Sequence, residues 1–122
     1  MKIIIFLLSI ITSSLTYAND EVVFDSQIAV DKAKILLREF AFNSGYTINK
    51  DTLNKEATVL AGIDKEGKKI VKVLFPDKNG AYETTFIINK DGWLILDTVG
   101  ETAYTIEAIS KRFKEAPYTV EY

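Results

Sequence analysis

Residues 57–99 decide the fold, and they read ATVLAGIDKEGKKIVKVLFPDKNGAYETTFIINKDGWLILDTV. Apolar residues in this stretch tend to recur at every second position, which is the spacing of a β-strand. Many of them are β-branched or aromatic, and such residues favour strands. The short connections contain Gly, Asn-Gly and Asp-Gly, which favour tight hairpins. We therefore predict a four-stranded antiparallel meander, with strands at residues 57–63, 69–75, 82–89 and 93–99.

Both faces of the predicted sheet carry apolar side chains. In the second run, Val71, Val73 and Phe75 share one face. Ile70 and Leu74 share the other face. An antiparallel sheet with one solvated face alternates cleanly between apolar and polar residues, and this one does not. We therefore expect the C-terminal segment or a partner to cover part of the second face.

An amphipathic helix is predicted before the meander. Asp25 or Ser26 can cap its N-terminus, because a short polar side chain accepts hydrogen bonds from the free backbone N–H groups there. The helix runs to about Asn43, and Gly45 suits a left-handed C-terminal cap. Its charged side is interpreted as a solvated face. Its apolar stripe needs a sheet to cover, and the stripe consists of Val30, Ala33, Leu36, Leu37, Phe40 and Ala41.

A second, short helix and a possible edge strand are predicted after the meander. Thr102 or Thr105 can begin the helix, and Pro117 ends it. Residues 118–122 alternate as an edge strand would. The polar segment 47–56 is interpreted as a long connection. The predicted fold class is α+β: a long N-terminal helix packed on a four-stranded antiparallel meander, with a short C-terminal helix and a possible edge strand.

The first eighteen residues are typical of a secretory signal peptide. Lys2 precedes an apolar run at residues 3–11 that is too short to span a bilayer, and Ala18 ends a plausible recognition site for cleavage. We therefore expect cleavage near Ala18 and a single domain at residues 19–122. Without cysteine the domain cannot be stapled by disulfides, which favours a bacterial periplasm, with secretion as the alternative. No second apolar stretch is long enough to insert in a membrane after processing.

Composition argues against several kinds of chemistry. The chain has no cysteine and no histidine, so thiolate catalysis, the commonest general base and the commonest metal ligand are all absent. Its formal net charge of -2 argues against nucleic acid as a partner. The turns at residues 77–80 and 89–92 carry oxygen ligands but lack the full pattern of a calcium loop. We predict neither a metal nor a cofactor.

Carboxylates are the remaining candidates for acid–base chemistry. Asp97 and Glu101 lie near the end of the fourth run, and Glu107 follows in the C-terminal helix. A glycosidase pair needs two carboxylates roughly 5 to 10 Å apart across a cleft. A small sheet with one long helix offers little depth for such a cleft. We therefore do not expect an enzyme, and a small hydrolase that uses these carboxylates is the alternative.

Trp93 raises the question of recognition. It is the only tryptophan and follows the Asp91-Gly92 turn directly. Core packing is the favoured interpretation, although tryptophan is also enriched at binding hot spots. Tyrosines add contact area and a polar group at modest entropic cost. The candidates for contact with a protein partner are Trp93, Tyr82, Tyr104, Asp91 and Glu101.

Two families resemble parts of this pattern. One long helix followed by a four-stranded meander is similar to the cystatin-like architecture. Residues 58–62, which read TVLAG, resemble the Gln-x-Val-x-Gly segment of cystatin protease inhibitors, with Thr58 in place of Gln and Leu60 in place of the central Val. Trp93 resembles the tryptophan of their Pro-Trp loop, although no Pro precedes it. The helix–meander order, with residues 82–96 as its last hairpin, also resembles PepSY-type exported domains. These resemblances imply an α+β fold without a catalytic motif, and the first implies protease inhibition.

Taken together, these features favour an exported small binding protein that neutralises another protein. A periplasmic immunity protein that blocks a cell-wall-targeting toxin or hydrolase is the model we favour. Such a protein would occlude its target with a central aromatic anchor and a polar rim. The alternatives are a structural or assembly module of an envelope complex, which includes self-association as a homodimer, and a cystatin-like protease inhibitor.

Overall fold

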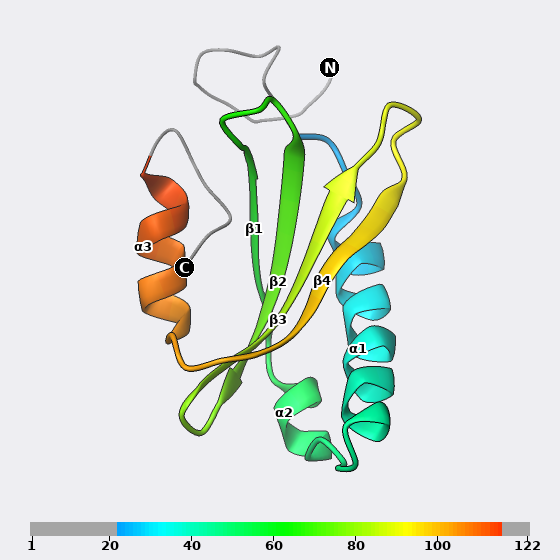
Figure 1. Cartoon of the computed structure of the whole chain (residues 1–122), viewed down its shortest axis with the longest axis vertical. Helices are drawn as coiled ribbons and strands as arrows, with labels where there is room; N and C mark the ends of the chain where they lie inside the picture. Colours follow the sequence, from blue (N-terminus) through cyan, green and yellow to red (C-terminus); the bar gives the residue numbers. More distant parts are fainter. Residues whose placement is uncertain (1–21, 116–122) are drawn as a thin grey trace.

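The meander predicted from residues 57–99 is present in the computed structural model, which describes residues 22–115. The four strands form one antiparallel sheet in the order β1-β2-β3-β4 (Figure 1). The predicted α+β class is confirmed. The expected signal peptide and the expected edge strand at residues 118–122 lie outside the described residues. The elements are α1 (Ser26–Asn43), α2 (Lys50–Asn54), β1 (Thr58–Ile63), β2 (Lys69–Asp77), β3 (Gly80–Ile88), β4 (Leu94–Thr102) and α3 (Ile106–Lys114).

The central strands are longer than predicted because their pairing continues to the turn. β2 and β3 stay in register from Lys69↔Ile88 to Asp77↔Gly80, so only two residues form the loop between them. Gly80 is required at this corner, because a Cβ there would collide with the backbone carbonyl oxygen of Thr102. The close approach of Gly80 to Thr102 allows β4 to stay paired with β3 as far as Thr102, beyond the predicted end at residue 99.

The predicted N-terminal helix is confirmed and covers one face of the sheet. The Asp25 carboxylate accepts hydrogen bonds from the backbone N–H groups of Gln27 and Ile28, at 2.9 and 3.1 Å, and so caps α1. The helix meets the sheet through a row of mostly small side chains at a spacing of four residues. These buried side chains are Ala29, Ala33, Leu37 and Ala41. They pack in one cluster with Val71, Val73, Phe75 and Phe86 of β2 and β3.

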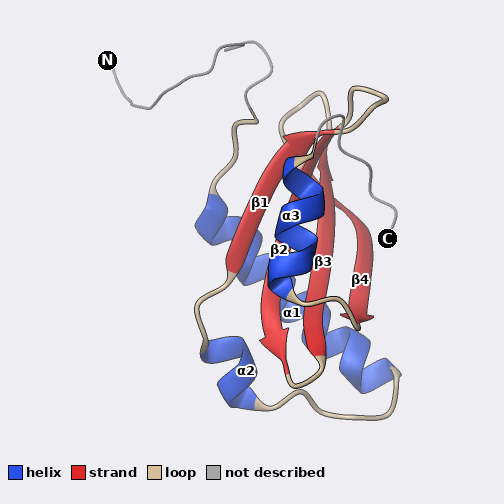
Figure 2. Ribbon diagram, turned by 90° about the vertical axis from the view of Figure 1, so that its left-hand side faces the viewer, coloured by secondary structure: helices blue, strands red, loops and turns tan. Residues whose placement is uncertain are grey.

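The second face is covered by α3, as the mixed pattern of the strands predicted. Figure 2 shows α1 and α3 on opposite faces of the sheet. Thr105 caps α3, and its hydroxyl accepts a hydrogen bond from the N–H group of Ala108 at 3.1 Å. Ile109 packs with Leu74 and Ala81, and Phe113 packs with Ile70. The predicted C-terminal helix is therefore confirmed, with Thr105 and not Thr102 as its cap.

The segment predicted as a long connection contains a short helix. α2 begins after Asn49, whose side chain accepts a hydrogen bond from the N–H group of Asp51 at 2.8 Å. Ile48 and Leu53 are buried in the same cluster that α1 covers. The prediction for residues 47–56 was wrong because two isolated apolar residues show no periodicity, yet both pack in the core.

A buried ion pair joins the two central strands on the face that α3 covers. Lys72 Nζ lies 2.6 Å from Glu83 Oε2 and donates a second hydrogen bond to Thr85 Oγ1 at 2.9 Å. Only 2% of the Lys72 side chain and 13% of the Glu83 side chain are exposed. Burial lowers the pKa of Lys72 below its ordinary value of 10.5, although Glu83 opposes this effect. Charges buried this deeply are stable only while they are paired.

We predict that Lys72→Met lowers the free energy of unfolding by about 3 kcal/mol, because it leaves the Glu83 carboxylate without its cation. The double variant Lys72→Met/Glu83→Leu should recover most of this loss, since no buried charge then remains. Urea unfolding of the four proteins in the double-mutant cycle measures both effects. A double variant as unstable as the single one would show that the pair stabilises the sheet by attraction and is not merely tolerated.

Candidate functional site

The β3–β4 hairpin holds Trp93 in a rigid turn. The Asn89 side-chain oxygen accepts hydrogen bonds from the N–H groups of Asp91 and Trp93, at 3.0 and 2.9 Å. Two backbone hydrogen bonds, from Asn89 to Trp93 and from Gly92 to Asn89, close the loop. Gly92 has φ 86°, a conformation that glycine adopts without strain. The Asn89 side-chain oxygen, one of the oxygen ligands noted in this turn, therefore serves the turn itself.

Trp93 points away from the core. Its exposed fraction is 64%, so the prediction of core packing was wrong. The reason lies in the register: Leu94 is the first residue of β4 and pairs with Ile88, which leaves Trp93 in the loop beyond the sheet. A large exposed aromatic side chain on a fixed backbone is the arrangement found at binding hot spots.

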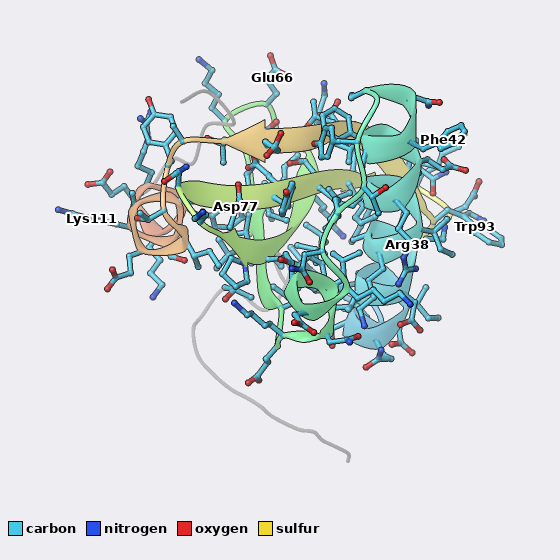
Figure 3. The ribbon with its side chains drawn as sticks, turned by 90° about the horizontal axis from the view of Figure 1, so that it is seen from below. Arg38, Phe42, Glu66, Asp77, Trp93 and Lys111 are labelled. Carbon is cyan, nitrogen blue, oxygen red and sulfur yellow. The ribbon has the colours of Figure 1, made fainter. Side chains whose placement is uncertain are left out.

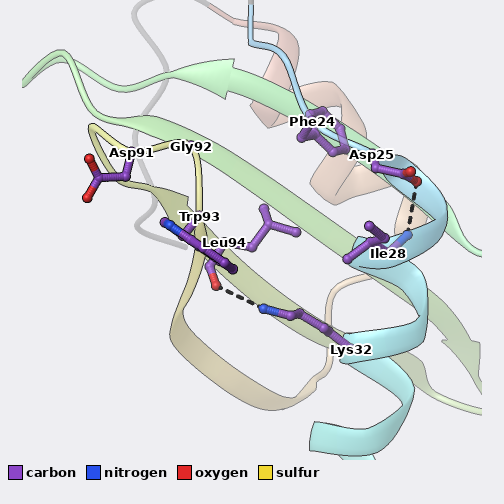
Figure 4. Close-up of a pocket in the computed structure, with 8 residues that line it drawn as sticks. All are labelled: Phe24, Asp25, Ile28, Lys32, Asp91, Gly92, Trp93 and Leu94. Atoms are coloured by element: carbon purple, nitrogen blue, oxygen red, sulfur yellow. Dashed lines mark hydrogen bonds between the residues drawn. The ribbon is translucent and has the colours of Figure 1, made fainter.

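A groove of about 400 Å³ opens between Trp93 and the beginning of α1 (Figure 4). Its apolar wall consists of Phe24, Ile28, Trp93 and Leu94. Polar groups at its edges come from Asp25, Lys32, Asp91 and Gly92. Lys32 Nζ donates a hydrogen bond to the Leu94 carbonyl oxygen at 3.4 Å, which ties α1 to β4 across the groove. A groove of this size lies at the small end of the range for ligand pockets and can accept an aromatic side chain.

The groove belongs to a larger apolar surface, which we call the α1/β4 flank. Five of the eight large apolar side chains that are exposed in residues 22–115 lie on α1, on the α1-covered face of β4 or just before β4, with exposed fractions between 42% and 82%. They are Ile28, Ile35, Phe42, Trp93 and Leu96. Ile95 is opposite Ile87, which packs on the α3 side of the sheet, so it points to the other face. Figure 3 shows Phe42 and Trp93 projecting to the same side of the molecule, away from Asp77 and Lys111.

The area of this flank is at the upper end of the range for a protein surface patch. If a whole large apolar side chain exposes roughly 200 Å², the five leave on the order of 600 Å² open to solvent. The largest apolar patch on a typical monomer is about 300 to 600 Å², and such patches are often functional. Sequence reasoning missed the α1 part of the flank, although Ile28, Ile35 and Phe42 recur at intervals of seven residues.

The structure separates the five predicted contact residues. Asp91 and Trp93 lie together beside the groove. Glu101 lies near the other end of β4, about 26 Å away at about 3.3 Å per residue. Tyr82 is opposite Glu101 and only 8% exposed, so its ring is not available as a surface contact. Tyr104 lies beyond β4, where the Arg112 guanidinium sits 5.9 Å from the centre of its ring.

Glu101 forms part of a tyrosine cluster. The Tyr46 hydroxyl donates a hydrogen bond to Glu101 Oε1 at 2.9 Å, which joins the turn after α1 to β4. Partial burial and, after it, the Glu101 carboxylate raise the pKa of Tyr46 to about 12. Burial also raises the pKa of Tyr82, and Asp77 and Glu101 add to this effect. Glu101 thus has a structural role that the sequence did not reveal.

The carboxylates considered for hydrolysis do not line the groove. Asp97, Glu101 and Glu107 are all absent from its walls, whose only carboxylates are Asp25 and Asp91. Asp25 already caps α1. Within residues 22–115, no group of three or more acidic side chains is arranged to hold a metal ion.

Comparison with known proteins does not assign a family. No family model, curated protein sequence or solved structure matches the chain. The two segments that resemble cystatins lie at opposite edges of the sheet, residues 58–62 in β1 and Trp93 in the loop just before β4. Within the described residues, no helix has both the length and the apolar character needed to cross a membrane.

We predict that the Tyr46–Glu101 pair makes the fold sensitive to alkaline pH. Tyr46 ionises at about 12 in the folded chain and near 10.0 when unperturbed, so its stabilising contribution is complete below pH 10 and is lost as the pH rises toward 12. Tyr46→Phe should therefore make the loss of stability over this window shallower than in the wild type. Glu101→Gln should fall between the two, because the effect of burial remains.

Urea unfolding at a series of pH values measures these slopes. Equal slopes for the wild type and both variants would contradict the assignment of this alkaline sensitivity to Tyr46.

Proposed function

We propose that this chain is an exported small binding protein that neutralises another protein by occluding it. The observation that carries the proposal is the exposed Trp93 beside an apolar groove, on a hairpin whose backbone is fixed by Asn89. A rigid aromatic anchor binds without first losing conformational freedom, and so more of its contact energy appears as affinity. A periplasmic immunity protein against a cell-wall-targeting toxin or hydrolase is the specific model.

The surroundings of the groove have the composition of a protein interface. Its apolar wall is edged by the carboxylates of Asp25 and Asp91 and by the ammonium group of Lys32. An apolar centre with a charged rim is the usual anatomy of protein–protein contacts, in which the rim contributes mainly to specificity and association rate. The partner should therefore present an apolar side chain with charged groups around it.

Export is part of the proposal. Residues 1–18 combine an early lysine, a short apolar run and a small residue before the expected cut. Expression of the full chain in a Gram-negative host should yield a periplasmic protein that begins near Asn19. Fractionation followed by N-terminal sequencing tests this directly, and a cytoplasmic protein that retains Met1 and Lys2 would refute it.

We predict that the mature chain, residues 19–122, captures one protein from a periplasmic extract of its source in stoichiometric amount. Trp93→Ala should reduce the recovery at least about tenfold, because truncation of a central aromatic anchor is costly. Tyr104→Ala is the matched control, since Tyr104 is an exposed aromatic residue outside the flank.

The two variants must first show the same thermal unfolding as the wild type. Undiminished capture by Trp93→Ala would refute the assigned site, and capture of envelope assembly proteins would favour the structural-module alternative. A capture of cysteine proteases with loss of their activity would favour the cystatin-like alternative.

A further inference from the structure

Three large apolar side chains of α1 face outward. The residues that the helix buries against the sheet are three alanines and Leu37. Its outward side instead carries Ile28, Ile35 and Phe42, and Phe42 is 82% exposed. Seven residues separate each of these from the next, which places them in one row along the helix, as in the seam of a coiled coil. A monomer leaves half or more of each of these three side chains in water, which is unfavourable for apolar surface.

The spacing of the row and the groove along α1 fits a two-fold arrangement of two copies. Ile28 lines the groove, and Phe42 lies fourteen residues further on, about 21 Å along the helix at about 1.5 Å per residue. Ile35 lies midway between them. A two-fold axis through Ile35 and perpendicular to α1 pairs two copies of the helix in antiparallel fashion. It brings Phe42 of each copy to Ile28 of the other, at the mouth of the groove.

We infer that the mature chain forms a two-fold homodimer through α1, in which Phe42 of each copy occupies the groove beside Trp93 of the other. The dimer is isologous: the same surface serves both copies, and both grooves are filled. The most exposed apolar side chain of the flank thereby enters the concave part of the same flank.

The charges beside the row are complementary under the same operation. Asp31 and Arg38 lie along one side of the row, and Lys32 and Glu39 lie along the other, all of them exposed. The axis through Ile35 places Asp31 opposite Arg38 of the second copy, and Lys32 opposite Glu39. Each opposite-charge pair occurs twice in the dimer. Charge patterns of this kind set the orientation in which helices associate.

The available area suits a dimer of this kind. The flank exposes on the order of 600 Å² of apolar surface. With the charged side chains beside the row, the area approaches the roughly 800 Å² that each partner buries in a stable interface. Pairing through the edge of β4 is a poorer solution. Thr85 pairs with Thr98 and Phe86 with Leu96, so Asp97 is an extra residue in a bulge. A bulge with a carboxylate is a device that protects an edge strand from further pairing.

The inference rests on the proposed function in one respect, because both use the groove beside Trp93. A target protein and a second copy then compete for the same groove. In the dimer the groove is already occupied, so the dimer must dissociate before the target binds. The proposed dimer and the proposed target binding can be refuted independently of each other. The dimer is measured on the purified chain alone, whereas target binding needs an extract.

The first test is sedimentation velocity of residues 19–122 from about 1 µM to about 1 mM. The wild type should become dimeric within this range, and Phe42→Asp should weaken the dimer at least tenfold. Lys111→Gln changes the net charge by the same amount on the opposite side of the molecule and should have no effect (Figure 3). A wild type that stays monomeric throughout, or a Phe42→Asp protein that dimerises normally, would overturn the inference.

The second test reverses the charges beside the row. Arg38→Asp alone and Asp31→Arg alone each place like charges opposite each other in the dimer, and each should weaken it about tenfold. The combined variant Asp31→Arg/Arg38→Asp restores opposite charges and should return the dissociation constant to within about threefold of the wild type. Additive weakening in the combined variant would exclude the antiparallel register.

The third test uses the absence of native cysteine. In the antiparallel dimer only Ile35 meets its own copy, so Ile35→Cys should form a disulfide between copies under mild oxidation. Ile28→Cys is the control, because Ile28 meets Phe42 of the second copy and should not cross-link. Efficient cross-linking through Ile28→Cys with none through Ile35→Cys would refute the proposed axis.

Discussion

The contact between α1 and the sheet determines which surface the molecule offers. Ala29, Ala33 and Ala41 let the helix lie close against β2 and β3, because the separation of packed elements depends on the side chains between them. Small side chains bury little apolar area, so the helix contributes less to the core than its length allows. Leu37 is buried and Leu36 packs against the same cluster, whereas Ile28, Ile35 and Phe42 point outward. The exposed α1/β4 flank is therefore a consequence of which side of α1 packs against the sheet.

The rest of the fold keeps this flank rigid and leaves it uncovered. α3 and the buried Lys72–Glu83 pair occupy the other face of the sheet. The Tyr46–Glu101 hydrogen bond anchors the end of α1 to β4, and the Lys32 hydrogen bond to Leu94 anchors its beginning. Both ends of the helix are thus tied to the edge strand. A surface held at both ends can bind a partner without first being ordered, which favours affinity.

Much of the fold could be predicted from local sequence patterns, whereas the site depends on how segments that are distant in the sequence pack together. The period of two, the glycine turns and the Asp25 cap predicted the strands, the hairpins and α1. α2 was missed because Ile48 and Leu53 show no period, although both are buried. The stripe predicted for α1 is the side that the sheet covers, since Ala33, Leu37 and Ala41 are buried. The second row of apolar side chains, at Ile28, Ile35 and Phe42, was not anticipated. The burial of Trp93 was predicted wrongly, because its exposure depends on the residue at which β4 begins to pair with β3. The wide separation of Trp93 and Glu101, in contrast, follows from the length of the strand alone.

The central claim is that the groove beside Trp93 is filled in the working state of the protein, by a second copy or by a target. Trp93 is the only tryptophan, so its fluorescence reports on this groove alone. The most direct measurement is the emission spectrum of residues 19–122 across a dilution series. It is repeated in a periplasmic extract with a tryptophan analogue at position 93 that is excited at a longer wavelength than the tryptophan of the extract. The account predicts emission typical of exposed tryptophan in dilute solution and a shift to shorter wavelength on concentration or on addition of extract. Emission that stays that of exposed tryptophan under every condition would contradict it.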